Sequence, residues 1–320
     1  MSQPWAVKKI HHLTGSLFIS SGNLIADRRY EWARDCQAKG DTEGAADLLS
    51  QVIELAPAYA AAWYALGQVR EKLDDKTGAI AAFEKALAAD PADRHGAALH
   101  LFRLGVRPAG AMPEGYIRAL FDGYAPAFEK ALTEGLGYRA PELLFRAVSA
   151  AVRDGEMKFG SVLDLGCGTG LAALPFRPFS DWIAGVDLSP AMLAIARSKG
   201  LYDRLTESEM LTFLAGETGL KARYHLVIAA DVFMYCGDLA AILAAVAGVL
   251  ANRGLLVFSV ETHDGDGMIL RDTLRYAHGR ALVESAIERA GLKRLSLEFV
   301  STRTEKGAPV PGMIVIATAA

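Results

Sequence analysis

Several features are scarce in this sequence, and each scarcity excludes a class of protein. Cysteine occurs only at Cys36, Cys167 and Cys236, and this odd, scattered set provides no metal cage and suits a reducing compartment. We therefore expect no metal site. The longest apolar run, Leu239 to Ala251, has thirteen residues. It is too short to span a bilayer and is more typical of a buried helix.

An excess of positive charge is also missing. The chain carries 34 Lys and Arg against 37 Asp and Glu, a net charge of -3. A dedicated nucleic-acid binder would show a net basic domain. The N-terminus has no convincing signal-peptide cleavage site. We expect a cytoplasmic protein that binds neither nucleic acid nor a membrane.

Two copies of a helical repeat lie in the alanine-rich first third. The stretches GAADLLSQVIELAPA and GAIAAFEKALAADPA contain Pro57 and Pro91, which lie 34 residues apart. This period and pattern resemble the tetratricopeptide repeat. The second copy matches the pattern at Trp63, Leu66, Gly67, Ala79, Phe83, Ala86 and Pro91, whereas the first, about 26–59, has Arg29 where Trp is expected. Small residues in the pattern let two antiparallel helices approach closely, and Ser20 or Ser21 is expected to cap the first helix.

Two repeats are fewer than a free-standing array usually needs, so the array should lean on another surface. We leave open whether that surface belongs to the following domain, a peptide partner or a second copy in a homo-oligomer. The Pro- and Gly-rich stretch from Gly105 to Gly115 is the predicted linker. We expect a tail over 1–20, a repeat module over 21–108 and a second domain over 109–320.

Strands and helices alternate after Ser161. We predict strands near 161–165, 182–187, 203–206, 225–230 and 254–261, which indicates a parallel sheet covered on both faces. Two terminal strands, LKRLSLEFV and PGMIVIATA, flank a polar turn and should form an antiparallel hairpin. The predicted class is an α/β, Rossmann-like, seven-stranded sheet closed by this hairpin, behind an all-α repeat domain.

The stretch VLDLGCGTG places Gly166, Gly168 and Gly170 directly after the first predicted strand. Glycine lacks a side chain, so a ligand can lie against the backbone there. The spacing differs from the G-x-G-x-x-G of dinucleotide sites, and no Lys-Ser/Thr pair follows to make a P-loop. Asp164 suits the cationic methionine of S-adenosylmethionine better than a pyrophosphate.

A second carboxylate, Asp187, ends the next predicted strand in GVDLSPAML, 23 residues after Asp164. A carboxylate there can accept both ribose hydroxyls. Together the two motifs resemble those of class I S-adenosylmethionine-dependent methyltransferases, over about residues 112–320. The resemblance implies that S-adenosylmethionine is the cofactor. It also implies these cofactor-binding residues: Asp164, Gly166, Cys167, Gly168, Asp187, Leu188, Glu209, Met210 and Asp231.

The segment YIRALFDGYAPAFEKAL resembles a helical cover in small-molecule methyltransferases. We predict a lid over 112–150, in which Tyr116 and Tyr124 face the cofactor or pack in a core. A hydroxyl or amine acceptor also needs a base. We predict His278, in a loop that leads into the last helix, and Tyr235, just beyond the fourth strand, as the catalytic residues.

These observations favour a methyltransferase for an oxygen or nitrogen acceptor, and the lid favours a small molecule as that acceptor. One alternative is a protein methyltransferase whose acceptor is recruited by the repeats. Another is a non-catalytic scaffold or sensor that binds the cofactor, with the repeats as its working surface.

Overall fold

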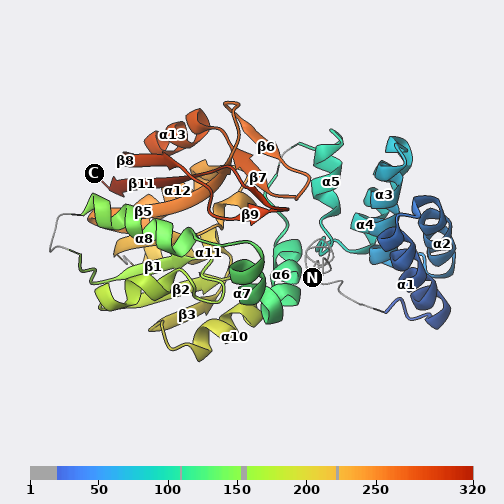
Figure 1. Ribbon diagram of the computed structural model, residues 1–320, viewed down its shortest axis with the longest axis horizontal. Helices are drawn as coiled ribbons and strands as arrows, with labels where there is room; N and C mark the ends of the chain where they lie inside the picture. The colour runs from blue at the N-terminus through green and yellow to red at the C-terminus, as the bar shows by residue number, and fades with distance from the viewer. Residues whose placement is uncertain (1–19, 109, 153–156, 221–222, 320) are drawn as a thin grey trace, which may run out of the picture. The chain divides into compact units, whose positions relative to one another are not determined.

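The computed structural model describes residues 20–108, 110–152, 157–220 and 223–319 (Figure 1). The chain divides into two compact units, a helical unit that ends at Leu120 and a sheet unit that begins at Phe121. The division falls within helix α6 (Glu114–Tyr124), about a dozen residues beyond the boundary predicted at 108/109. Each unit is described separately.

The helical unit contains two helix pairs, as the repeat pattern predicts. The pairs are α1 (Leu24–Lys39) with α2 (Thr42–Leu55), and α3 (Ala60–Lys72) with α4 (Lys76–Ala89). A Cβ atom at Gly67 would lie 2.6 Å from the Phe83 ring, so only glycine permits this approach of α3 to α4. The cap of α1 differs from the prediction. Asn23 accepts the N–H groups of the first turn, while Ser20 and Ser21 bind Asp27 instead.

A short fifth helix, α5 (Ala97–Arg103), packs against α4 and brings a buried polar cluster with it. His100 is 5% exposed, and its Nδ1 lies 2.6 Å from Glu71 while its Nε2 lies 3.2 Å from the Tyr64 hydroxyl. Arg103 pairs with the second oxygen of Glu71 at 2.9 Å. The face of α3 that carries Tyr64 and Glu71 is therefore covered by α5.

The sheet unit begins with the end of α6 and a run of short helical turns. These are η2 (Ala125–Ala127), α7 (Phe128–Lys130), a π-helical turn η3 (Ala131–Gly135) and α8 (Ala140–Ala151). Pro126 lies in the first turn of η2, where its missing N–H costs no hydrogen bond.

The central sheet confirms the predicted fold class. Its described strands are β1 (Val162–Leu165), β2 (Ile183–Asp187), β3 (Arg204–Glu207), β4 (Tyr224–Ala229), β5 (Leu250–Thr262), β6 (Met268–Leu270), β7 (Tyr276–His278), β8 (Leu292–Phe299) and β11 (Gly312–Ala319). Seven follow the order β3-β2-β1-β4-β5-β11-β8. Strands β1 to β5 run parallel, and β11 is antiparallel to both β5 and β8. The carboxyl ends of the parallel strands thus share one edge, where ligands of such sheets bind.

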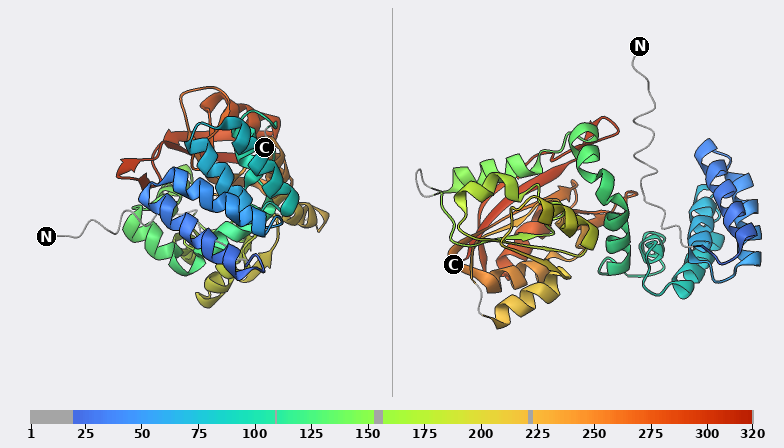
Figure 2. Two further views of the ribbon diagram at one scale, coloured as in Figure 1. Left: turned by 90° about the vertical axis from the view of Figure 1, so that its right-hand side faces the viewer. Right: turned by 90° about the horizontal axis from the view of Figure 1, so that it is seen from below.

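Apolar helices cover both faces of this sheet, because the strands are apolar on both sides. Residues of α8 and α9 (Ala173–Phe176) share one core with the sheet, and α11 (Met210–Gly219), α12 (Leu239–Val249) and α13 (Arg280–Arg289) share the other. The right-hand view in Figure 2 shows the sheet between the two layers. The helix α10 (Pro190–Ser198) joins β2 to β3, and Ser189 caps it as its sequence suggests. No helix of the described residues is long and apolar enough to cross a membrane.

Two small strand pairs were not predicted. The loop expected before the last helix instead contains β7, which pairs with β6 and lies parallel to the end of β5. The polar turn between β8 and β11 contains the two-residue strands β9 (Thr304–Glu305) and β10 (Ala308–Pro309). Both additions lie at the end of the sheet where β4 and β5 finish. At the edge of the sheet, β8 is largely exposed.

Candidate active site

The loop after β1 contains the three glycines of the motif, and all three have positive φ. A Cβ atom at Gly166 would lie 2.3 Å from Val232, so packing alone excludes a side chain there. Gly168 differs, because a Cβ atom would meet only Phe128, at 3.9 Å. The space beside Gly168 therefore suits a ligand that lies against the backbone.

Asp187 connects this glycine loop to the end of β2. Its carboxylate accepts the backbone N–H of Gly168 and that of Ser189, both at 2.8 Å. Burial raises the pKa of Asp187, and the two N–H groups oppose that change. Each carboxylate oxygen retains a lone pair after these bonds, so both can accept a hydroxyl.

Asp164, on β1, is buried and only half satisfied. One oxygen accepts the Tyr202 hydroxyl at 2.7 Å, and the other, Oδ1, has no hydrogen-bond partner. Burial raises the pKa of Asp164 to about 7, although the bond from Tyr202 lowers it. A cationic ligand nearby would stabilise the ionised carboxylate. The unpartnered oxygen, the open side of Gly168 and Asp187 fit S-adenosylmethionine.

The other residues predicted to contact the cofactor lie around this loop. Leu188 follows Asp187, and Ser208, which precedes Glu209, donates its backbone N–H to the Asp187 carbonyl at 3.1 Å. Glu209 caps the N-terminus of α11, and Met210, the first residue of that helix, packs against the hydrophobic core. Cys167 is buried, which raises the pKa of its thiol.

The segment formed by the end of α6 and by α7 is fixed to the loops that carry Asp187 and Gly168. Asp122 accepts the Ser189 hydroxyl at 2.5 Å and the Ala191 backbone N–H at 3.2 Å. Glu129 pairs with Lys199 at the end of α10. Because Phe128 lies beside Gly168, this segment reaches the open side of the glycine loop.

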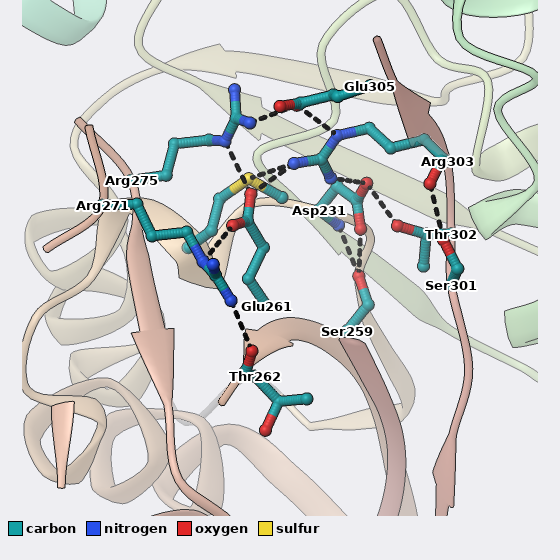
Figure 3. A network of polar contacts seen from close by, with 11 residues as sticks. Asp231, Ser259, Glu261, Thr262, Arg271, Arg275, Ser301, Thr302, Arg303 and Glu305 are labelled. Atoms are coloured by element: carbon teal, nitrogen blue, oxygen red, sulfur yellow. Dashed lines mark hydrogen bonds and ion pairs between the residues drawn. The ribbon is translucent and has the colours of Figure 1, made fainter. Parts of the chain in front are cut away.

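A buried ion-pair network lies at the carboxyl ends of β4 and β5 (Figure 3). At its centre, Arg303 is 6% exposed and contacts Asp231 at 2.8 Å, Glu305 at 3.2 Å, and Glu261. Burial alone would lower the pKa of Arg303, but Asp231 and Glu261 raise it. Asp231 also accepts hydroxyls from Ser259 and Thr302. The predicted cofactor residue Asp231 is therefore committed to this network.

Two further arginines extend the network towards the surface. Arg275 contacts Glu261 through Nε at 2.6 Å and Glu305 through Nη2, and its side chain is 18% exposed. Arg271 lies 3.2 Å from the second oxygen of Glu261 and donates to the Thr262 carbonyl at 2.6 Å. Three carboxylates and three guanidinium groups thus lie together.

Four aromatic residues, which we call the aromatic cluster, connect the glycine loop to this network: Phe121, Tyr124, Phe128 and Tyr235. The Phe121 ring lies 5.4 Å from Tyr235 and 6.2 Å from Phe128, and Tyr124 lies 5.4 Å from Phe128. Burial raises the pKa of Tyr235, and Arg275 and Arg303 oppose this change. Tyr235 is therefore near the arginines, and Phe128 is near Gly168.

Two predicted site residues lie elsewhere. His278 is fully buried in β7, where Nε2 bonds to the backbone carbonyls of Cys236 and Gly237 and Nδ1 has no partner. Burial lowers its pKa. A ring held in this way braces the strand and is not placed to take a proton from a substrate. Tyr116 belongs to the helical unit, where its ring lies beside Gly96, so we do not retain it in the cofactor site.

Sequence reasoning missed Asp122, Arg275 and Arg303. Asp122 lies in the segment predicted as a lid, and its acidic side chain among aromatic residues was a usable signal. Arg303 lies in the stretch predicted as a polar turn, and nothing in its local pattern distinguishes it from a solvated surface residue. Its partners Asp231 and Glu261 are far away in the sequence.

Comparison with known proteins agrees with this geometry. Residues 163–256 match the family of methyltransferase domains, and residues 30–94 match the tetratricopeptide repeat. The region that is similar to methyltransferase domains thus follows the region that is similar to tetratricopeptide repeats. The methyltransferase match covers the glycine loop, Asp187 and most of β5, and the repeat match covers most of the four helices of the two pairs.

Individual relatives are similar over part of their length. Human methyltransferase-like protein 27 is 37% identical over 117 residues, covering 36% of this chain and 47% of that protein. A ubiquinone biosynthesis O-methyltransferase from a Bradyrhizobium species is 32% identical over 98 residues, covering 31% and 38%. The chain thus spans less than half the length of these curated relatives.

Two solved structures are similar to part of this chain. A methyltransferase from Clostridium acetobutylicum has a TM-score of 0.46 and 18% identity, covering 62% of this chain and 98% of that one. Magnesium protoporphyrin IX methyltransferase from Synechocystis, with bound S-adenosylmethionine, has a TM-score of 0.43 and 20% identity, covering 56% and 79%.

Proposed function

We propose that this protein transfers a methyl group from S-adenosylmethionine to an oxygen or nitrogen atom of a small molecule. The observation that carries the proposal is the pairing of Asp187 with the backbone N–H of Gly168, a position where an added Cβ atom would meet only the ring of Phe128, at 3.9 Å. This arrangement offers a carboxylate and bare backbone at the carboxyl edge of a parallel sheet, where cofactors of such folds bind.

The residues of the chain have separate tasks in this proposal. Asp187 would hold the two ribose hydroxyls, Glu209 and Met210 would border the adenine, and Asp164 would compensate the positive charge of the methionine part. When bound, the cofactor supplies a sulfonium whose methyl carbon is electrophilic. Positioning then accounts for most of the acceleration, because an oriented acceptor reacts as if it were highly concentrated.

The segment from Phe121 to Lys130 is the proposed cover of the site. Its support is the bond of Asp122 to Ser189, the ion pair of Glu129 with Lys199, and the position of Phe128 beside Gly168. A cover of this kind excludes water and holds the acceptor against the donor.

A second candidate gives the repeats the recruiting role, so that the acceptor is a protein. It is supported by the exposed apolar residues Ile25 and Trp32, which lie seven residues apart on one face of α1. It is weakened by α5, which covers the face of α3 that carries Tyr64 and Glu71. We therefore favour a small-molecule acceptor. If the repeats bind a protein, we propose that they do so through the exposed face of α1.

The first test is calorimetric binding of S-adenosylmethionine and its demethylated product, S-adenosylhomocysteine. Asp187→Ala should weaken both by about 100-fold, because it removes charge-assisted hydrogen bonds to two hydroxyls. The exposed Asp181, whose carboxylate pairs with Lys158 at the surface, provides the matched control Asp181→Ala. No binding by the unchanged protein would refute the proposal and leave the repeats as the place to look for function.

A further inference from the structure

The side chains around the ion-pair network are already committed to partners. Methylation of a hydroxyl or an ammonium group requires a base to take a proton. His278 is buried on two backbone carbonyls, Glu261 faces three arginines, and Asp231 is bound to Arg303. Glu305 pairs with both Arg275 and Arg303. In the described part of the chain, none of these groups is a ready proton acceptor.

The tyrosines near the network do not fill this role. Burial raises the pKa of Tyr124 and that of Tyr235, so both hydroxyls keep their protons near neutral pH. An acceptor whose reacting atom is already ionised would need no base at all. Carboxylates meet this condition, because their ordinary pKa lies well below neutrality.

Arg275 has the geometry to hold such an acceptor. Its contacts with Glu261 and Glu305 use Nε and Nη2, whereas a guanidinium group carries five N–H donors. Its side chain remains 18% exposed, beside the aromatic cluster. The planar fork of arginine matches a carboxylate better than it matches a neutral hydroxyl.

The net charge of the network does not oppose an anion. The three arginines balance Asp231, Glu261 and Glu305, so the network has no net charge when all six side chains are ionised. The sulfonium of the donor adds one positive charge. Because Asp164 is proposed to compensate that charge, the attraction for an anionic acceptor comes from the N–H donors of Arg275 that its two ion pairs leave unused.

We propose that the acceptor is a carboxylic acid, bound as its carboxylate by Arg275 with its carbon skeleton against the aromatic cluster. This inference rests on the methyltransferase function proposed above. One carboxylate oxygen uses a lone pair to form the new O–CH3 bond while the S–CH3 bond breaks and its electron pair stays on sulfur. No proton is released, and the products are a methyl ester and the neutral thioether.

Fluorine NMR tests the recognition step with para-fluorobenzoate and para-fluorobenzamide, probes of nearly the same shape that differ in charge. The acid should bind about tenfold more tightly than the amide, which is the effect of one charge-assisted hydrogen bond. Arg275→Gln should remove this preference. Arg294→Gln, which changes an arginine on the exposed strand β8, is the matched control and should keep it.

Equal binding of the two probes, or binding of neither, would overturn the proposal, as would a preference that survives in Arg275→Gln. The comparison of acid with amide uses the unchanged protein, so it does not depend on the folding of a variant. The measurement needs no cofactor. A protein that prefers the acid but fails to bind S-adenosylmethionine would therefore refute the proposed function and not the anion site.

Discussion

The two sides of the proposed active site hold their carboxylates in opposite ways. Asp164 and Asp187 receive only a tyrosine hydroxyl and backbone N–H groups. Asp231, Glu261 and Glu305 are each paired with arginine. Carboxylates without a cationic partner leave a place for a cationic ligand, whereas paired ones have already been neutralised. This difference supports the proposal that the donor binds on the first side and the acceptor on the second.

The largest expected effect comes from removing the arginine at the centre of the ion-pair network, so that a buried carboxylate loses its cationic partner. Arg303→Met should lower the free energy of unfolding of the sheet unit by about 3–5 kcal/mol, because it leaves Asp231 buried without its cation and removes one of the three cations that face Glu261. Thermal unfolding of the full chain measures this change. Arg294→Met, on the exposed strand β8, should stay within about 0.5 kcal/mol of the unchanged protein. Similar losses in the two variants would mean that the network contributes no more than a surface pair.

Removing the hydroxyl that binds Asp164 should have the next largest effect. Tyr202→Phe leaves the buried carboxylate without its one side-chain donor, at a cost of about 1–3 kcal/mol in stability. The pKa of Asp164 should rise further, since the Tyr202 bond lowers it. Chemical denaturation measures the loss, and the double variant with Asp164→Asn should lose less than the two single changes together predict.

The pH dependence of cofactor affinity should directly test the role of Asp164, the carboxylate without a cationic partner. With a pKa of about 7, Asp164 is mostly protonated at pH 6 and mostly ionised at pH 8. Affinity for S-adenosylmethionine should therefore rise with pH by up to about tenfold over this range. S-adenosylhomocysteine, which has no sulfonium charge, should show a smaller rise, and Asp164→Asn should reduce the difference between the two ligands. The same slope for both ligands would contradict the role of Asp164.

Asp164 also predicts how the stability of the protein without cofactor depends on pH. Stability should fall as the pH rises, whereas the affinity for S-adenosylmethionine should increase. Because the folded-state pKa of Asp164 is raised, the folded protein binds more protons than the unfolded chain between about pH 4 and 7. Its contribution to stability is complete below that window and is lost as the pH rises through it. Unfolding at several pH values, with Asp164→Asn as the control, measures this contribution.

The smallest expected effect concerns the cover. Lys199→Ala breaks the ion pair with Glu129, which is only partly shielded from solvent, so the loss of stability should be about 0.2–1 kcal/mol. Dissociation of the cofactor should accelerate, because the cover would be held less firmly. Stopped-flow displacement measures that rate, and Lys158→Ala, on a solvent-exposed pair with Asp181, should leave it unchanged.

Sequence patterns predicted the parts of the fold that follow local rules. The repeat period located the helix pairs, and alternation with glycine turns located β1 and β2 to within a residue or two. The strands β6 and β7 have three residues each, too few for any period to be recognised. Their pairing depends on the end of β5, which tertiary structure alone brings beside them.

The residues of the candidate site also fall into two groups: those that local sequence motifs contain, and those that only the folded structure brings together. Gly168 and Asp187 lie in motifs whose spacing is fixed by one strand-to-helix turn each, so the sequence contains them. His278 was chosen for its chemistry, but the burial that disqualifies it is a property of the folded sheet. Arg303 meets Asp231 only across a separation of 72 residues, which no local pattern records.

The exposed edge strand β8 has a consequence for how this protein behaves at high concentration. An unpaired strand edge is a template on which another chain can add its own strand and start aggregation. Lys293, Arg294 and Glu298 lie along this edge and are exposed. A strand from another molecule that docked there would have to strip water from these charges. These charges oppose sheet-to-sheet aggregation at the edge of the sheet farthest from the cofactor loops, where Leu295 and Phe299 are also exposed.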